Sequence, residues 1–429
     1  MRVHVVDPSA YTPPYDHALC HALGVAGVEV ELATSRFAYA APPPPVGYAR
    51  RELFYRHAFG APGSRPRAAS KLVEHVPDML RYRRHAREAD LVHFQWLPVQ
   101  ALDVHLLPGG RPLVLTSHDV LPREPRRGQL AAQRRLYDRF DAIVVHSERG
   151  RSRLVDELRV DGDRVHVIAH GAFTHLLTAT AGAKDERGVE AAFAKARPPS
   201  SRTPSSLTPS SLTPSSRTPS SRTPSSPAPS SSTPSPPPPT RGRESPLLES
   251  NKPVVLMFGL MRPYKGIDVL LEAWRGVAGA SPIEHAELWV AGLPKMDISR
   301  LRGGAPANVR FDPRFIPDEE LPAYFEAADL VVLPYLQADQ SGVLFTALAF
   351  GKPLLLSDVG GFPEMADTGA ARIVPAGDAV ALGSALRMLL RDSAALEEMS
   401  AKARAAARGR FSWEASAAAH IDLYTQLLG

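Results

Sequence analysis

The sequence predicts two α/β domains, each a parallel sheet with helices on both faces, joined by a long unstructured insert. Three observations support this prediction. The chain of 429 residues is too long for one ordinary core. Short apolar runs separated by helical or polar segments recur in both halves, which is typical of doubly wound sheets. Between the halves lies a stretch without any apolar pattern. Two such domains leave a cleft between them, where a ligand can bind.

The first domain, residues 1–177, begins with a βαβ unit. We expect a strand at Val3–Val6, a loop that ends in Pro13 and Pro14, a helix at His17–Gly24 and a strand at Val28–Ala33. Later apolar runs predict four more strands, at Leu91–Phe94, Leu113–Thr116, Ala142–His146 and Val165–Ile168.

Several polar side chains lie at or just beyond the ends of these strands. They are His93, Gln95, His118, Asp119, Ser147 and His170. Because ligands bind at the carboxyl ends of parallel strands, we consider these residues together as one side of a crevice.

The insert, residues 178–250, differs in composition from both domains. Residues 201–226 repeat a five-residue unit, [RL]TPSS, and a proline-rich run follows. No apolar face is available to offset the entropy of ordering, so we predict disorder. A passive spacer is the simpler role, and an adaptor-binding or phosphorylated segment is the alternative.

The second domain, residues 251–429, begins with a buried strand at Pro253–Phe258. The loop GLMRPYKG follows, and an amphipathic helix runs through Trp274. Further strands are expected at Glu287–Ala291, Val309–Phe311, Leu330–Leu333, Leu354–Leu356 and Arg372–Val374. Ala-rich segments at 379–408 and 413–428 predict helices that cover this domain or cross back to the first.

Two loops of the second domain suit phosphate. Ser341 and Gly342 begin a helix at Val343–Phe350, whose free N–H groups and positive dipole end favour an anion. Arg262 and Lys265 follow the strand that ends at Gly259, and a guanidinium with an ammonium can bind a diphosphate. Taken alone, the two cations favour an ordinary exposed loop, because short Arg and Lys patterns are common, and it is the second phosphate-suited loop that favours a diphosphate site.

Composition limits the compartment and the partners that we expect for this chain. The single Cys20 excludes an internal disulfide framework and a cysteine-built zinc site. No apolar stretch reaches the length of a membrane span, and MRVHVVD lacks a signal-peptide pattern, so we expect a cytoplasmic protein without a nucleic-acid partner. Basic residues concentrate between Arg50 and Arg87. They fit either a solvated helix face or peripheral contact with the inner, anionic face of a membrane.

With these motifs, the chain resembles a known family, the GT-B fold retaining glycosyltransferases of family 4, also called glycosyl transferases group 1. The resemblance rests on FGLMRPYKGIDVLLEAW, FIPDEELPAYFEAADLVVLPY, SGVLFTALAFGKPLLLSDVGGFPE and FSWE, which together span nearly all of the second domain. The first domain agrees more weakly, through SHD, VVHSE and VIAHG.

The resemblance implies two facing Rossmann-like domains. The first would bind the acceptor, and the second a nucleoside diphosphate sugar that serves as donor substrate; neither a metal nor another cofactor is expected. Arg262 and Lys265 match the family's diphosphate-binding pair, and His118 a histidine near the donor. The remaining donor contacts are carried over to Gly259, Phe315, Ile316, Ser341, Gly342 and Val343. His170 and Gly171 match the end of the first domain.

The sequence departs from the family pattern in three places. Leu260 stands where the family has its arginine. The family's Glu-x7-Glu pair falls on Ala338 and Thr346, and we expect Asp339 to substitute for the first carboxylate. The glycine-rich first loop is replaced by Thr12-Pro13-Pro14, and Tyr15 and Asp16 would then line the cleft.

The expected activity is transfer of a hexosyl group to an acceptor hydroxyl with retention of anomeric configuration. The acceptor can be a carbohydrate, a lipid or a small molecule. Two other functions stay open at this stage. One is a non-catalytic nucleotide-sugar-binding subunit or sensor, which the missing glutamates favour. The other is hydrolysis or epimerisation of nucleotide sugars on a similar fold, for which no well-placed carboxylate or histidine set is evident.

Overall fold

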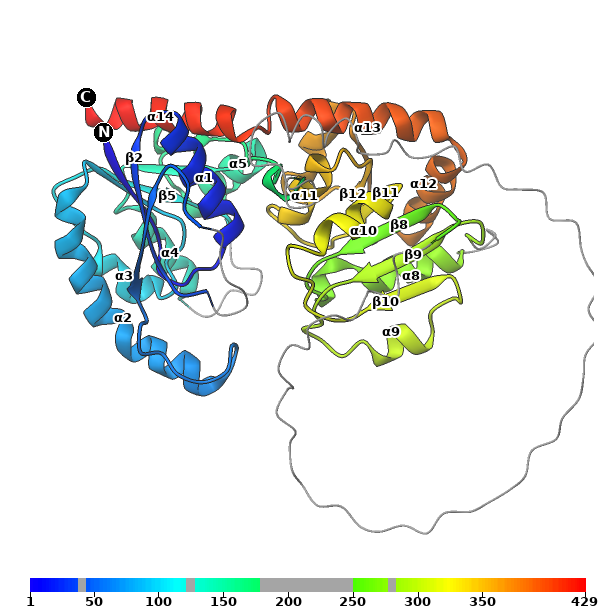
Figure 1. Cartoon of the computed structure of the whole chain (residues 1–429), viewed down its shortest axis with the longest axis horizontal. Helices are drawn as coiled ribbons and strands as arrows, with labels where there is room; N and C mark the ends of the chain where they lie inside the picture. Colours follow the sequence, from blue (N-terminus) through cyan, green and yellow to red (C-terminus); the bar gives the residue numbers. More distant parts are fainter. Residues whose placement is uncertain (38–43, 121–127, 178–249, 277–282) are drawn as a thin grey trace, which may run out of the picture.

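The computed structural model describes residues 1–37, 44–120, 128–177, 250–276 and 283–429. Within these ranges the chain forms two α/β lobes that lie side by side (Figure 1). The predicted fold class is confirmed, since each lobe is built on a parallel sheet. The disorder predicted for 178–250 concerns residues that lie outside the described ranges, except Ser250.

The first lobe contains a seven-stranded parallel sheet in the order β3-β2-β1-β4-β5-β6-β7. Its strands are β1 (Arg2–Asp7), β2 (Glu29–Ser35), β3 (Ala49–Phe54), β4 (Leu91–Phe94), β5 (Leu113–Thr116), β6 (Ala142–Val145) and β7 (Val165–Val167). Its helices are α1 (Pro13–Val25), α2 (Arg65–His85), α3 (Gln100–Leu106), α4 (Gln129–Tyr137) and α5 (Glu148–Leu158), with 3₁₀ turns η1 (Ala86–Glu88) and η2 (Gly162–Arg164).

The second lobe contains a six-stranded parallel sheet in the order β10-β9-β8-β11-β12-β13. Its strands are β8 (Val254–Phe258), β9 (Glu287–Ala291), β10 (Val309–Asp312), β11 (Leu330–Leu333), β12 (Leu354–Ser357) and β13 (Ala371–Val374). The helices that follow its strands are α8 (Ile267–Arg275), α9 (Ser299–Gly303), α10 (Leu321–Ala327), α11 (Gly342–Ala349), α12 (Ala379–Arg391), α13 (Ser393–Arg408) and α14 (Trp413–Leu428), with 3₁₀ turns η3 (Pro263–Lys265) and η4 (Phe362–Thr368).

The order of each sheet reverses direction at its first strand. β1 lies between β2 and β4, and β8 lies between β9 and β11. The loops that leave the carboxyl ends of neighbouring strands diverge at such a reversal and leave a crevice there. The loops after β8 and β11 are therefore the place to look for a ligand site.

The sequence left open whether the C-terminal helices cover the second domain or cross back to the first. The last helix crosses back and packs on the first lobe, although the predicted domain bounds placed it in the second. Figure 1 shows α13 lying over the second lobe and α14 over the first. Helix α14 begins at Ser412, whose side chain accepts a hydrogen bond from Ala415 N. Its buried face packs on α1, and the Tyr424 hydroxyl lies 2.6 Å from His93 Nδ1 of β4.

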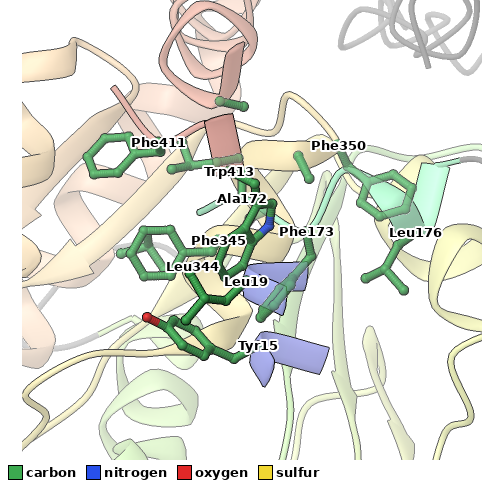
Figure 2. Packing of buried hydrophobic residues seen from close by; sticks show 14 of the residues in the cluster. Tyr15, Leu19, Ala172, Phe173, Leu176, Leu344, Phe345, Phe350, Phe411 and Trp413 are labelled. Atoms are coloured by element: carbon green, nitrogen blue, oxygen red, sulfur yellow. The ribbon is translucent and has the colours of Figure 1, made fainter. Parts of the chain in front are cut away.

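An apolar core runs continuously from one lobe into the other. Figure 2 shows its centre, where Tyr15 of α1, Phe173 after β7, Phe345 of α11 and Trp413 of α14 lie together. Gly171 permits this packing, because a Cβ there would lie 2.3 Å from Trp413 Cδ2. The lobes are thus joined by buried apolar surface as well as by the chain.

Candidate active site

Two loops of the second lobe meet at the reversal between β8 and β11. Leu336 N donates a hydrogen bond to Tyr264 O at 2.7 Å, which ties the loop after β11 to the loop after β8. Gly266, at φ +63°, lies so close to the Pro334 carbonyl that a Cβ would approach its oxygen to 2.0 Å. Any side chain at that position would push the two loops apart.

Gly259 allows three predicted site residues to come together. Its φ is +109°, and a Cβ there would lie 3.1 Å from Val343 Cγ2 and 3.2 Å from Lys265 Nζ. The end of β8, the side chain of Lys265 and the start of α11 therefore surround one point. The structure brings together Gly259, Lys265, Ser341, Gly342 and Val343, as the sequence predicts for a phosphate site.

Lys265 is held by an aromatic hydroxyl. Only 6% of the residue is exposed, and its ammonium donates a hydrogen bond to the hydroxyl of Tyr335 and lies 4.3 Å from the centroid of that ring. The Tyr335 hydroxyl lies 3.2 Å from Ser341 Oγ. Since the ammonium only donates, the Tyr335 oxygen accepts from it, and the Tyr335 hydroxyl can donate to Ser341 Oγ. These hydrogen bonds hold the ammonium of Lys265 beside the first turn of α11.

The first turn of α11 is suited to an anion. Ser341 occupies the N-cap position, and its side chain makes no capping hydrogen bond to the helix. The amide groups at the helix start and the positive end of its dipole point toward the loops. Gly342 leaves the helix start uncovered, and a Cβ added there would contact only Phe173 Cε2, at 3.5 Å, among the described residues.

The other predicted donor contacts differ in exposure. Arg262 is exposed at the start of η3. Phe315 is 41% exposed and Ile316 is 6% exposed in the loop after β10. That loop is held by Arg314, which donates to the carboxylates of Asp312 and Glu320. This ion-pair network was not predicted from the sequence, although charged residues lie on either side of the FIP segment.

His118 belongs to a hydrogen-bonded chain in the first lobe. His146 Nδ1 donates to Ile168 O at 2.9 Å, so His146 Nε2 accepts from His118 Nδ1 at 3.3 Å. The second nitrogen of His118 must then accept, yet it lies 3.1 Å from Gln95 Oε1. Turning the Gln95 amide resolves the conflict and gives its NH₂ group an acceptor, which that buried group otherwise lacks among the described residues.

The two histidines of this hydrogen-bonded series, His118 and His146, are neutral near pH 7. Burial lowers the pKa of His118 well below its ordinary value, and the neighbouring His146 and His170 lower it further. Burial also lowers the pKa of His146 to about 4. His118 therefore acts as a neutral hydrogen-bonding group, and a contact with a donor would replace one of its present bonds.

Aromatic rings form a platform beside His118. The rings of Trp96 and His118 stack with their centroids 5.0 Å apart and an interplanar angle of 15°. Tyr11, which is 66% exposed, lies 4.5 Å from Trp96, and the indole nitrogen donates to Thr12 Oγ1 at 2.9 Å. The three rings lie in the loops that follow β1, β4 and β5, at the carboxyl ends of these strands.

Tyr15 and Asp16 do not line the cleft, contrary to the prediction from the altered first loop. Tyr15 is 2% exposed in the core between the lobes, and Asp16 is 1% exposed. Burial, followed by the charge of Asp7, raises the pKa of the Asp16 carboxyl well above its ordinary value. Asp7 accepts from the backbone N–H groups of Ser9 and Thr12 and so holds the loop. The buried carboxyl groups of Asp7 and Asp16 thus stabilise the loop between β1 and α1.

Asp339 is engaged by the first lobe. One carboxylate oxygen accepts from Val120 N at 2.9 Å, and the other pairs with the guanidinium of Arg153. The family's glutamate positions are both buried, at Ala338 and at Thr346, whose hydroxyl donates to Gly342 O at 3.0 Å. The substitution of Asp339 for a sugar-binding glutamate stays a prediction, and its contacts here hold the lobes together.

Two profiles of known families match the chain. The profile for "Glycosyl transferases group 1" matches residues 252–392, and the profile for "Glycosyltransferase Family 4" matches residues 15–175. Together they cover most of both lobes in the order expected for one enzyme family. The chain belongs to the family 4 glycosyltransferases. The donor-side loops of this family 4 chain lie within the first match, and its His118 cluster lies within the second.

Curated relatives match this family 4 chain over part of its length. A phosphatidyl-myo-inositol mannosyltransferase of Mycobacterium leprae is 32% identical over 178 residues, which are 40% of this chain and 46% of the relative. A D-inositol 3-phosphate glycosyltransferase of Streptomyces avermitilis is 33% identical over 186 residues, 40% of this chain and 39% of the relative. The chain therefore spans less than half the length of these relatives.

Solved structures with the same fold cover the whole of this family 4 chain. Sucrose-phosphate synthase from Thermosynechococcus elongatus has a TM-score of 0.66 at 18% identity, covering 100% of this chain and 99% of its own. Anabaena HepE in complex with UDP-glucose has a TM-score of 0.63 at 15% identity, covering 100% of both chains. These similarities show the fold, and they bear on the GT-B architecture alone.

Proposed function

We propose that this chain transfers a hexosyl group from a nucleoside diphosphate sugar to an acceptor hydroxyl, retaining the anomeric configuration and using no metal ion or organic cofactor in the reaction. The observation that carries the proposal is the convergence of Lys265, Gly259 and the start of α11 at one point. A buried ammonium beside free helix amides suits a diphosphate that gains negative charge as it leaves. Arg262, exposed in the same loop, would add a guanidinium from the solvent side.

The proposed reaction exchanges one bond at the anomeric carbon for another on the same face. The bond from that carbon to the diphosphate oxygen breaks while the acceptor oxygen bonds to the carbon. The acceptor's proton passes to an oxygen of the departing phosphate. His118 is neutral, so its role here is to position the sugar by a hydrogen bond that replaces its bond to Gln95.

The acceptor would bind against the aromatic platform of Tyr11, Trp96 and His118. Flat aromatic faces suit the C–H faces of a sugar or polyol ring. Two relatives are named for inositol-containing substrates, so we include a polyol or its phospholipid with carbohydrates and small molecules as acceptors.

Helix α2 offers a surface for peripheral membrane contact. Four apolar side chains on one side of it are exposed, namely Leu72, Val73, Val76 and Leu80. Arg65, Arg83 and Arg84 are exposed on the same helix. A helix with an apolar stripe and flanking arginines is suited to binding at the interface of an anionic bilayer. None of the helices in the described ranges has the length and apolar character needed to cross a bilayer.

Donor binding and turnover test the main proposal. UDP-, GDP- and ADP-sugars are screened by thermal shift, and the product anomer is identified by NMR. Lys265→Ala should lose turnover by at least tenfold, while Lys402→Ala, a loss of charge on α13, should leave it unchanged. Binding without turnover against a panel of acceptors would favour the non-catalytic subunit instead. An inverted product would contradict the mechanism.

Vesicle sedimentation tests the membrane contact. The full chain should sediment with anionic vesicles and much less with zwitterionic ones. The double variant Leu72→Glu/Val73→Glu should stay in the supernatant. Val380→Glu is the control, since Val380 is 51% exposed on the other lobe. Equal sedimentation of all three proteins would rule out α2 as the contact.

A further inference from the structure

Three potential metal ligands meet under the C-terminal end of α2, remote from the loops described above. His4 of β1 and Glu31 of β2 are paired in register, so their side chains leave the same face of the sheet. His85, the last residue of α2, covers that face. One ligand atom from each of the three side chains lies within 4.8 Å of the other two.

The three side chains are already in mutual contact. His85 Nε2 lies 2.5 Å from Glu31 Oε1, and the rings of His4 and His85 stack with centroids 5.0 Å apart at an angle of 25°. Glu31 is 4% exposed at its side chain and His85 is 16% exposed. The cluster is therefore buried except at the His85 edge, which provides a way in for a small ion.

His4 lacks the partners that a buried imidazole requires. The residue is 0% exposed, and neither ring nitrogen has a hydrogen-bond partner among the described residues. An apolar side chain at this position of β1 would avoid the free-energy cost of burying two polar atoms without hydrogen-bond partners. An ion pair between His85 and Glu31 accounts for those two residues and leaves His4 unexplained.

We propose that His4, Glu31 and His85 bind a divalent transition metal ion, with Zn²⁺ the best match. Two imidazoles and one carboxylate are a known zinc ligand set, and a water molecule would complete the tetrahedron at the His85 edge. Ligand atoms around a tetrahedral zinc ion lie about 3.3 Å apart, given bonds of about 2.0 Å. In the present structure the corresponding atoms lie within 4.8 Å of one another.

Two charged neighbours would orient the ligand side chains. Glu88 Oε1 lies 3.5 Å from His85 Nδ1, so the carboxylate can accept that N–H and direct Nε2 toward the metal. Arg51 Nε lies 3.0 Å from Glu31 Oε2, which leaves Oε1 for the ion. The cluster lies toward the amino ends of β1 and β2, whereas His118 follows the carboxyl end of β5. The ion would have a structural role, fastening the last turn of α2 to the sheet.

Metal binding by the full chain tests this proposal. The protein is stripped with a chelator, desalted and titrated with Zn²⁺ while its thermal midpoint is followed. One equivalent should bind and raise the midpoint by several degrees. Co²⁺ replaces Zn²⁺ as a spectroscopic probe, and its visible absorption should indicate a low-coordinate site with nitrogen ligands.

Two variants and a control decide the ligand assignment. His85→Gln, at the solvent edge, should weaken Zn²⁺ binding at least a hundredfold and abolish the Co²⁺ bands. His4→Leu should remove the zinc effect while leaving the metal-free protein at least as stable as the metal-free wild type. His57→Gln is the control, because the side chain of His57 is 86% exposed and outside the cluster. An unchanged midpoint with Zn²⁺ in the wild type, or equal binding by His85→Gln, would overturn the proposal.

Discussion

Replacing Asp339 tests how the two lobes are held together. Its carboxylate accepts from Val120 N of the first lobe and pairs with Arg153, and only 7% of the residue is exposed. A buried hydrogen bond to a charged group contributes about 1.5–3 kcal/mol. Arg153 is 33% exposed at its side chain, so that pair adds only about 0.5–1 kcal/mol. Asp339→Ala should therefore destabilise the contact by about 2–4 kcal/mol.

Asp339→Asn separates the two contributions. The amide oxygen can still accept from Val120 N, but this neutral hydrogen bond contributes only about 0.5–1.5 kcal/mol. With the lost ion pair, the expected loss is therefore about 1.5–2.5 kcal/mol. Urea unfolding of each variant measures the change in midpoint and slope, and small-angle scattering reports whether the lobes separate. In a double-mutant cycle, Arg153→Ala with Asp339→Asn should show a coupling of about 0.5–1 kcal/mol.

The same variants distinguish a structural role from sugar binding. If Asp339 serves only the contact between the lobes, Asp339→Asn and Arg153→Ala should change donor KM alike. A rise in donor KM confined to the Asp339 variants would favour the predicted sugar contact. Strict additivity in the cycle, with equal losses for Asn and Ala, would refute the reasoning from hydrogen bonds.

Three further changes follow from the packing and from the buried histidines. Gly259→Ala, at φ +109° and with Val343 Cγ2 at 3.1 Å from the new Cβ, should weaken nucleotide binding at least tenfold in calorimetry, whereas Gly63→Ala, with nothing within 4 Å, should leave affinity unchanged. Gly171→Ala forces the Trp413 ring to move and should lower the unfolding free energy by about 1–3 kcal/mol in urea titrations; an unchanged midpoint would contradict the packing of Figure 2. Burial lowers the pKa of His146 and of His420 to about 4, so the unfolded chain binds more protons than the folded one between about pH 6.5 and pH 4. Stability should accordingly be retained above pH 6.5 and fall below it, by about 2 kcal/mol per histidine at pH 5, and a urea midpoint that stays level between pH 7 and pH 5 would exclude this.

Most strands of both sheets were predictable because they are short apolar runs, and those at the centre of each sheet are fully buried. Leu91–Phe94, Leu113–Thr116, Glu287–Ala291 and Leu330–Leu333 form strands with the predicted bounds. The edge strand β3 was missed, since its sequence ARRELF is largely exposed and lacks an apolar run. Periodicity identifies a strand by what it buries, and an edge strand buries little.

Only part of the candidate site was visible in the sequence. The glycines and cations of the loops after β8 and β11 lie in local motifs, so their meeting follows from the order of the sheet. The bond between Lys265 and Tyr335 crosses 70 residues, and that between Arg153 and Asp339 crosses 186. His4 and Glu31 look like isolated polar residues in two strands, and only the register of β1 and β2 places them together.

Helix α14 has a consequence for how the chain could be divided. Its buried face completes the first lobe, where it packs on α1 and where Tyr424 bonds His93. A fragment that ended at residue 177 would leave the apolar side of α1 open to water, and a fragment that began at residue 251 would carry a helix with nothing to cover. The first lobe is thus discontinuous in sequence, and its folding is completed only when α14 has been synthesised.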